Sequence, residues 1–305
     1  MRIAFLISTF TDPRHLRRLI NALDSKESDF FVHVDRKVDP EPFKQLCCLP
    51  NVHFIADRVN VYWGTYSQVE FQMRLIRAAL DFSKDISHLF MLSGQDYPLW
   101  SISHIQEFLQ NLHGEELISE IQVDSDEVEE RHKAIYRQFR PQTDWKCLSP
   151  TGNDWLSKCW RKAARLTHVR KPLALTVDGN EWHLYKGSDY FCISRRLAEY
   201  VFGQWNAHPE IARYFASSFA PSETCIQTIT FNNPDFREKA DLHKGPYTTL
   251  KDLTRLHHID YVPVIRVWKE KDLQELQDSG KMFARKFSTG ISDSLLDKLD
   301  AGAMD

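Results

Sequence analysis

Arg2-Ile-Ala-Phe-Leu-Ile-Ser8 opens the chain, and Phe30-Phe-Val-His-Val34 follows it after a segment with helical periodicity. Within that segment, residues 13–24, large aliphatic side chains recur on one face: Leu16, Leu19, Ile20 and Leu23. Near-continuous apolar strands joined by a helix predict a mostly parallel sheet that is covered by helices on both faces. Ligands bind such sheets at the carboxyl ends of the strands, so Ser8 and Asp35 are candidate binding residues.

The alternation of strands and helices continues along most of the chain. An aromatic glycine turn at residues 61–67 precedes a predicted helix, whose apolar stripe is Val69, Met73, Ile76 and Leu80. Further strands are predicted over residues 51–55, 88–92, 115–122 and 256–262, and further helices over 103–112 and 270–279. The periodicity weakens over 123–172, which predicts a partly helical insertion that forms a lid or an acceptor-side wall. No strong linker interrupts the pattern, so residues 1–305 are predicted to form a single α/β domain.

Composition excludes several classes of protein. Charged residues make up 27% and hydrophobic residues 42% of the chain, so disorder is not expected, and the net charge of −3 disfavours a nucleic-acid binder. The first apolar run is too short to span a membrane and lacks a cleavage site, and the six cysteines show no Cys-x-x-Cys spacing. We therefore expect reduced cysteines and a cytoplasmic protein. The basic stretch 157–171 is either a peripheral membrane or nucleic-acid contact or, more commonly, a solvated helix.

Familiar cofactor and metal motifs are missing or weak. The chain has no dinucleotide-binding glycine fingerprint, no Walker loop and no Gly-x-Ser-x-Gly elbow. Asp124 and Asp126 form an Asp-x-Asp pair, but such a spacing is common by chance and we do not expect a metal there. His257 and His258 are adjacent in a predicted strand, so their rings face opposite ways and joint chelation is not expected. His33 is expected in the core.

One carboxylate and one basic pair stand out as candidates for chemistry. Pro221 and Ser222 predict the start of a helix with Glu223 in its first turn, where the helix dipole favours an ionised carboxylate and hence a general base. The alternative is that Glu223 is an ordinary helix-start residue. Arg285 and Lys286 lie between two phenylalanines, a pattern that pins the backbone and directs one cation inward. A lysine about 4 Å from a pyrophosphate contributes roughly 4 kcal/mol at an effective dielectric near 20.

Six short motifs follow one another over nearly the whole chain. They are Phe-Val-His-Val-Asp-Arg-Lys (31–37), Val-Tyr-Trp-Gly-Thr-Tyr-Ser (61–67), Leu-Ser-Gly-Gln-Asp-Tyr-Pro-Leu (92–99), Lys-Gly-Ser-Asp-Tyr (186–190), Pro-Ser-Glu (221–223) and Phe-Ala-Arg-Lys-Phe (283–287). In this order the chain resembles the core-2/I-branching β-1,6-N-acetylglucosaminyltransferases, a family that also includes the peptide O-xylosyltransferases.

The resemblance implies a fold and an activity. The fold would be GT-A-like, with a Rossmann-like nucleotide half at about 1–115 and an acceptor and catalytic half at about 116–305. The activity would be an inverting transfer of a sugar from a UDP-sugar to a hydroxyl of an oligosaccharide, polysaccharide or lipid-linked glycan. N-acetylglucosamine is the sugar that the resemblance favours. Neither a divalent metal nor another cofactor would be needed. A bacterial-style member of this kind would serve polysaccharide biosynthesis in the cytoplasm, at or near the inner face of the membrane.

The resemblance also implies roles for individual residues. Glu223 would be the general base, and Lys286 with Arg285 would neutralise the leaving UDP. The remaining nucleotide-binding residues would be Ser8, Asp35, Tyr62 and Trp63, and the residues that line the sugar site would be Asp96, Gly187, Ser188 and Asp189. Family members often carry an arginine that helps to bind the diphosphate; here His257 occupies that place and Arg255 lies two residues earlier, and both are assigned to the nucleotide site.

Three alternatives remain open at this point. The donor could be UDP-xylose or another UDP-sugar. The chain could be a non-catalytic sugar-nucleotide-binding module, although Glu223 and Lys286 are both present. It could also be a glycoside hydrolase that uses a pair of carboxylates such as Asp189 and Glu223.

Overall fold

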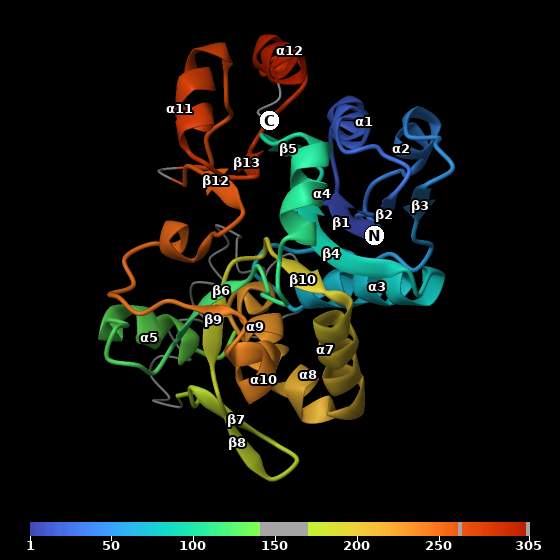
Figure 1. The fold of residues 1–305 in the computed structure, drawn as a ribbon. Coiled ribbons are helices and arrows are strands. Elements are labelled where there is room, and N and C mark those ends of the chain that lie inside the picture. Colours follow the sequence, from blue (N-terminus) through green and yellow to red (C-terminus); the bar gives the residue numbers. More distant parts are fainter. Residues whose placement is uncertain (141–169, 262–263, 303–305) are drawn as a thin grey trace.

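A five-stranded sheet forms the centre of the molecule (Figure 1). The structure, a computed structural model, describes residues 1–140, 170–261 and 264–302. In spatial order the strands are β10 (Cys192–Ser194), β4 (Ile86–Ser93), β1 (Arg2–Thr9), β2 (Ser28–Val34) and β3 (Val52–Phe54). Four of them are parallel, and β10 runs antiparallel to β4 at one edge. The prediction of an α/β fold around a mostly parallel sheet is confirmed.

Helices cover both faces of this sheet. Consecutive side chains of a strand point to opposite faces, so the sheet contributes to two separate hydrophobic clusters. Ala4 and Leu6 face one hydrophobic cluster, which also contains the buried sides of α3 (Ser67–Phe82) and α7 (Arg195–Ala207). Phe5 and Ile7 face a second cluster, to which α1 (Pro13–Ala22), α2 (Glu41–Leu46) and α4 (Ile102–Gln110) contribute. Ser101 caps α4, since its hydroxyl accepts the N–H of His104 (3.2 Å).

Three small sheets extend from the central one. The first contains β11 (Asp241–Leu242), β6 (Ser119–Gln122) and β9 (Tyr185–Gly187). The second contains β12 (His257–Ile259), β13 (Phe283–Arg285) and β5 (Asp96–Pro98), and the third is the hairpin of β7 (Ala174–Val177) and β8 (Asn180–His183). The strand predicted over 115–122 is shorter than expected, because Leu117 pairs with Cys192 of β10 before β6 begins.

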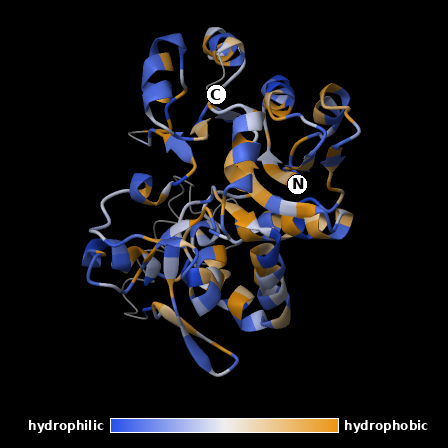
Figure 2. Ribbon diagram, in the orientation of Figure 1, coloured by the Kyte–Doolittle hydropathy of each residue, from blue (hydrophilic) through white to orange (hydrophobic). Residues whose placement is uncertain are grey.

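The remaining helices are short and surround these sheets, and their hydrophobic residues face inward (Figure 2). They are α5 (Glu130–Tyr136), α8 (Pro209–Phe215), α9 (Cys225–Phe231), α10 (Pro234–Arg237), α11 (Leu273–Asp278), α12 (Asp293–Ala301) and the 3-10 turns η2 (Pro221–Glu223), η3 (Leu250–Leu253) and η4 (Glu270–Asp272). Among the described residues, no helix combines the length and the apolar character needed to cross a bilayer. Most of the basic stretch 157–171 lies outside the described residues.

Candidate functional site

Glu223 lies in the first helical turn after Pro221, as predicted, but this turn is the short 3-10 helix η2 and not the start of an α-helix. Ala220 has a left-handed backbone (φ 43°), and the N–H groups of Glu223 and Thr224 bond to the carbonyls of Ala220 (3.0 Å) and Pro221 (3.1 Å). These bonds form η2, and α9 begins only at Cys225. An alanine in this conformation is uncommon, and Ala220 is held there by a hydrogen bond from its N–H to the carbonyl of Gly64 (3.1 Å).

Lys186 of β9 forms an ion pair with Glu223, through its Nζ and the carboxylate Oε2. The lysine side chain is 6% exposed and the glutamate side chain 18% exposed. The ring of Tyr136, at the end of α5, lies 5.8 Å from the ammonium. Burial by itself would lower the pKa of Lys186, but Glu223 and the nearby tyrosines raise it well above its usual range. The lysine is therefore a fixed positive charge beside the candidate base.

The turn after β9 brings a second carboxylate close to Glu223. Burial and the charge of Glu223 raise the pKa of Asp189 to about 7. Gly187 is required here, because a Cβ at this position would lie 2.5 Å from the carbonyl oxygen of Ser119. Ser188 is buried, and it holds the turn by accepting the N–H of Tyr190 (3.2 Å) and the side-chain amide of Gln227 (2.8 Å). Of the predicted sugar-site residues in this motif, Asp189 is the one placed next to Glu223.

The Asp96 side chain is fully buried, and three surrounding groups donate hydrogen bonds to it. Its carboxylate accepts hydrogen bonds from Arg285 (3.0 Å), from His257 (3.1 Å) and from the N–H of Ser93 (2.7 Å). Although burial would raise the pKa of Asp96, His257 and Arg285 lower it below its usual value. Because none of this side chain is exposed, Asp96 lies behind the site and positions Arg285; it does not line a sugar pocket in this structure. The ring of His257 is equally sealed.

The basic pair has the arrangement that its flanking phenylalanines predict. Phe283 and Phe287 are fully buried, and Arg285 points inward to Asp96. Lys286 is half-buried, and its backbone N–H and carbonyl bond to Arg266 (3.2 Å) and Trp268 (3.0 Å). In the part of the chain that the structure describes, no hydrogen bond or ion pair engages the Lys286 ammonium. Its charge is therefore available to a ligand.

The two charged clusters lie close to one another. Asp189 interacts electrostatically with Glu223, Lys186 and Arg285. Tyr261, which follows β12, interacts with Glu223 and Asp189, and it also acts on Arg285. The carboxylate of Glu223 and the guanidinium of Arg285 thus share two neighbours, Asp189 and Tyr261.

The predicted uridine residues are at the carboxyl edge of the central sheet. Asp35 follows β2 and binds Lys37 twice, through the backbone N–H (2.9 Å) and the ammonium (2.8 Å). The ammonium lies over the ring of Tyr62, 4.4 Å from its centroid, and also bonds to the carbonyl of Val61. Ser8, near the end of β1, is half-buried and pairs in register with His33 of β2. Lys37 therefore joins two of the predicted uridine residues.

Trp63 and Gly64 connect this edge of the sheet to the turn that carries Glu223. Trp63 is 60% exposed and meets the ring of Phe219 edge-on at 5.8 Å. Gly64 has a left-handed backbone (φ 73°), and its carbonyl accepts the N–H of Ala220. Trp63 is thus placed beside the turn that carries Glu223.

Other candidates from the sequence lie elsewhere. Arg255 donates to the carbonyl of Glu116 (3.4 Å), and no interaction places it with Arg285 or Lys286 within the described ranges. Asp124 pairs with His183 (3.1 Å). In the described residues, no group of three or more His, Cys, Asp or Glu side chains has an arrangement suited to a metal. His33 is buried as predicted and accepts the N–H of Val59 (3.0 Å).

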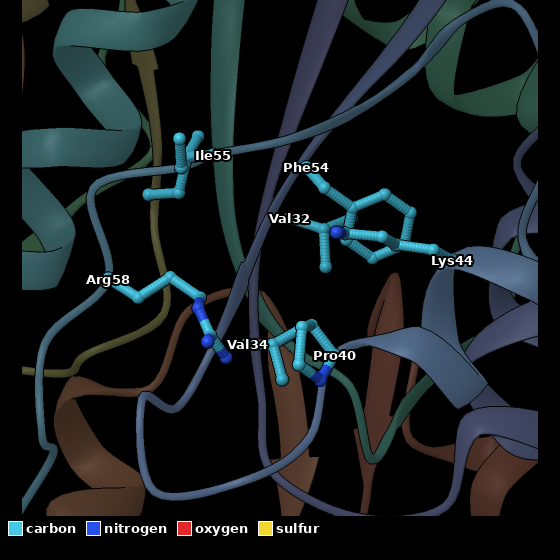
Figure 3. Close-up of a pocket in the computed structure, with 8 residues that line it drawn as sticks. Val32, Val34, Pro40, Lys44, Phe54, Ile55 and Arg58 are labelled. Atoms are coloured by element: carbon cyan, nitrogen blue, oxygen red, sulfur yellow. The ribbon is translucent and has the colours of Figure 1, made fainter.

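A pocket of about 290 Å³ lies under the Asp35 loop, on the side that faces α2 (Figure 3). Apolar side chains from β2 and β3 form much of its wall, and Lys44 and Arg58 extend over it. Arg58 donates to the carbonyls of Val38 (2.9 Å) and Asp35 (3.4 Å), so it supports the loop. Glu223 and Arg285 do not line this pocket.

Two functional candidates were missed from the sequence, Lys186 and Lys37. Both stand inside motifs that carry the resemblance, next to Gly187 and two residues after Asp35. Their position in those motifs was the available signal. Their partners, however, come from a turn 37 residues away and from the loop before α3, which periodicity does not reveal.

Comparison with known proteins identifies the family. Xylosyltransferase sqv-6 of Caenorhabditis briggsae is 25% identical over 76% of this chain, which spans 27% of that protein. Mouse beta-1,3-galactosyl-O-glycosyl-glycoprotein beta-1,6-N-acetylglucosaminyltransferase 3 is 22% identical over 98% of this chain and 67% of its own length. The solved structure of mouse xyloside xylosyltransferase 1 is 11% identical, with a TM-score of 0.33, over 80% of this chain and 84% of that chain.

The chain spans about a third or less of the xylosyltransferases that it matches first. A model of one family covers most of the chain itself, from residue 3 to residue 275. This range includes the central sheet, Lys186 and Glu223, and it ends before Arg285. The chain belongs to the Core-2/I-Branching enzyme family.

Proposed function

We propose that the protein is a glycosyltransferase with a GT-A-like fold, which transfers a sugar from a UDP-sugar to a hydroxyl of a glycan. Family membership supports this class of activity, and the named relatives include xylosyltransferases and an N-acetylglucosaminyltransferase. One observation carries the proposal. The partly exposed carboxylate of Glu223 and the guanidinium of Arg285 lie near the same residue, Asp189, and Lys286 follows Arg285 in the chain. N-acetylglucosamine is the proposed donor sugar, and xylose is the alternative.

The proposed reaction is one in-line displacement. The acceptor hydroxyl gives its proton to Glu223 as its oxygen bonds to the anomeric carbon. The bond from that carbon to the UDP oxygen breaks, and its electron pair leaves on the β-phosphate, where Lys286 and Arg285 stabilise the charge. The attack from the opposite side inverts the configuration to a β-linkage. These cations would do the work that a divalent metal does in other transferases, so no metal is required in this proposal.

Uridine would bind at the sheet edge, where Asp35, Ser8 and Tyr62 lie. The Lys37 ammonium binds the Asp35 carboxylate and lies over one face of the Tyr62 ring. A nucleoside that stacks on that face must therefore displace the ammonium. The acceptor would be an oligosaccharide, a polysaccharide or a lipid-linked glycan. A cytoplasmic location, with a peripheral membrane contact through residues 157–171, also stays a prediction.

The test is incubation with a panel of UDP-sugars and glycan acceptors, with and without excess EDTA, while UDP release and product mass are recorded. We expect acceptor-dependent UDP release that persists in EDTA and a product heavier by one sugar. Strict dependence on Mn²⁺ would contradict the metal-free reaction. Absence of transfer with every donor would favour a non-catalytic sugar-nucleotide-binding module.

One observation favours a second candidate, a glycoside hydrolase. Asp189, whose pKa is raised to about 7, lies beside Glu223, and retaining and inverting hydrolases use such a pair as acid and base or nucleophile. Sugar release to water from one of the glycans, in an incubation without any UDP-sugar, would support the hydrolase instead. The same incubations, repeated without donor, decide between the two.

A further inference from the structure

The two carboxylate oxygens of Glu223 have different surroundings. Oε2 is held by the ammonium of Lys186, which is almost completely buried. Oε1 accepts no hydrogen bond from the residues that the structure describes, and the side chain as a whole is partly exposed. One oxygen is thus anchored to the protein, and the other is left for a ligand.

We propose that Lys186 is a positioning residue: by holding Oε2 of Glu223 it directs Oε1 toward the acceptor hydroxyl. The inference rests on the proposed function and deepens it, because it states which oxygen of the base receives the proton. A free carboxylate would rotate between orientations, whereas an anchored one presents a single lone pair in a fixed direction. Positioning of this kind contributes strongly to rate, and a misplacement of about 1 Å costs about 100-fold.

The lysine keeps its own proton throughout the reaction. When the acceptor oxygen bonds to the anomeric carbon, its proton moves to Oε1, and Glu223 becomes a neutral carboxylic acid that still accepts a hydrogen bond at Oε2. Lys186 remains an ammonium because Glu223 and the tyrosines beside it stabilise its charge more than burial disfavours it. The proton then leaves from Glu223 to solvent, to which this side chain is partly open.

Other titratable groups surround the pair and must be counted in any pH dependence. Tyr136 of α5 and Tyr247, which precedes η3, both face Lys186 and Glu223. Asp189 after β9 and Tyr261 after β12 face Glu223, and Arg285 of β13 acts on Asp189. Cys225 at the start of α9 faces Tyr66, next to α3. Among these groups Lys186 is the cation that contacts the Glu223 carboxylate, so substitution of Lys186 removes a contact that none of the other groups makes.

The experiment compares three variants with the wild-type chain. Lys186→Met removes the charge and keeps much of the volume, and Lys186→Arg restores a cation at the same position. Lys171→Met is the matched control, because Lys171 is also buried but bonds to Tyr214 and to the hydroxyls of Ser217 and Ser218. It removes a buried ammonium that has no carboxylate partner in the described residues.

Turnover, nucleotide binding and folding are measured separately. The values of kcat and of KM for the acceptor are measured with the donor found in the panel, and UDP binding is measured by calorimetry. Thermal unfolding reports the packing cost of each variant.

In Lys186→Met we expect kcat to fall about 100-fold at pH 7, while KM for the acceptor changes less and UDP binding is unchanged. Lys186→Arg should return kcat toward the wild type, and Lys171→Met should lower the unfolding temperature without changing kcat. A kcat in Lys186→Met close to that of the wild type would overturn the inference, even if that variant is less stable. If the wild type transfers no sugar, the proposed function fails, and Lys186 has no catalytic role to position.

Discussion

Two ion pairs in this molecule differ in which partner is buried, the carboxylate or the cation. In Asp96–Arg285 the carboxylate is sealed and the cation is partly exposed; in Lys186–Glu223 the cation is nearly sealed and the carboxylate is partly exposed. In both, the inner partner fixes the charge and direction of the outer one. The outer ends are what a ligand meets, an anion from one pair and a cation from the other.

The supporting contacts differ in a way that fits these roles. Asp96 has two further donors, His257 and the N–H of Ser93, so its position is fixed from three sides. Lys186 has one carboxylate partner and a distant aromatic ring, Tyr136. We therefore expect the first pair to contribute mainly to stability and, under the proposed function, the second mainly to chemistry. Substitutions on each side should separate these two consequences.

The largest effect should come from the outer anion. Glu223→Gln keeps the shape and an oxygen for Lys186 but removes the basic oxygen, so we expect transfer to fall by about 10²–10⁴-fold. UDP binding, measured by calorimetry, should be unchanged because this side chain meets the acceptor and not the nucleotide. Turnover of Glu223→Gln close to that of the wild type would remove Glu223 from the role of base.

The inner anion should matter for folding. Asp96→Ala leaves Arg285 and His257 without their carboxylate, and loss of one partner of a buried pair costs about 3–5 kcal/mol of the free energy of unfolding. Urea denaturation at pH 7 measures it, with the exposed Asp297→Ala, which pairs with Arg18, as a control expected to change stability by about 1 kcal/mol at most. Equal losses in the two variants would contradict the role given to Asp96.

The same pair predicts a dependence on acid. Because the folded pKa of Asp96 lies below its usual value of 3.8, its contribution is present above that value and is lost as the pH falls through the folded pKa. The difference in stability between wild type and Asp96→Ala should therefore be full at pH 6 and shrink in strong acid. A difference that grows on acidification would contradict the lowered pKa.

The sequence predicts Asp96 and Arg285 of the first pair and Glu223 of the second as site residues, but it does not predict how the pairs form. The phenylalanines around Arg285 indicated an inward cation, and Pro221 with Ser222 drew attention to Glu223. Asp96 and Arg285, however, are 189 residues apart and meet because β13 and β5 align them directly across the antiparallel pair. Apolar periodicity specifies strands and helices, but it does not specify which distant strands pair or in what register.

The difference in helix type at η2 has a local cause. A helix was expected to open at Pro221, and one does, but it follows a left-handed alanine at 220 and is a 3-10 turn, and α9 begins only at Cys225. Alanine has no propensity that announces this conformation; it is imposed by the hydrogen bond to Gly64, in another motif. The consequence is functional, because the 3-10 turn places Glu223 against β9 and Lys186.

Lys286, the neighbour of the outer cation Arg285, offers a smaller and cleaner effect on the nucleotide. Lys286→Ala removes a half-buried ammonium that has no partner in the described part of the chain, so the fold should be preserved. We expect UDP affinity to fall about tenfold or more, which corresponds to about 1.4 kcal/mol, by calorimetry at fixed salt. Lys298→Ala, which breaks an exposed pair with Glu270 on the surface, should leave UDP binding unchanged. Unchanged affinity in Lys286→Ala would place the diphosphate elsewhere.

The smallest effect concerns Asp189, which stands between the two pairs and belongs to neither. Burial and Glu223 raise its pKa to about 7, so the fold prefers its neutral form, and this contribution to stability is lost as the pH rises from 3.8 through about 7. Asp189→Asn is neutral at every pH, so its unfolding temperature should exceed that of the wild type by about 2–4 °C above pH 8, and the gap should narrow toward pH 4. Asp81→Asn, at an exposed pair on α3, should show no such trend. A gap that stays constant from pH 4 to pH 9 would mean that Asp189 is ionised already at pH 4, and that Arg285 and Lys186 together outweigh the charge of Glu223 at this point between the two pairs.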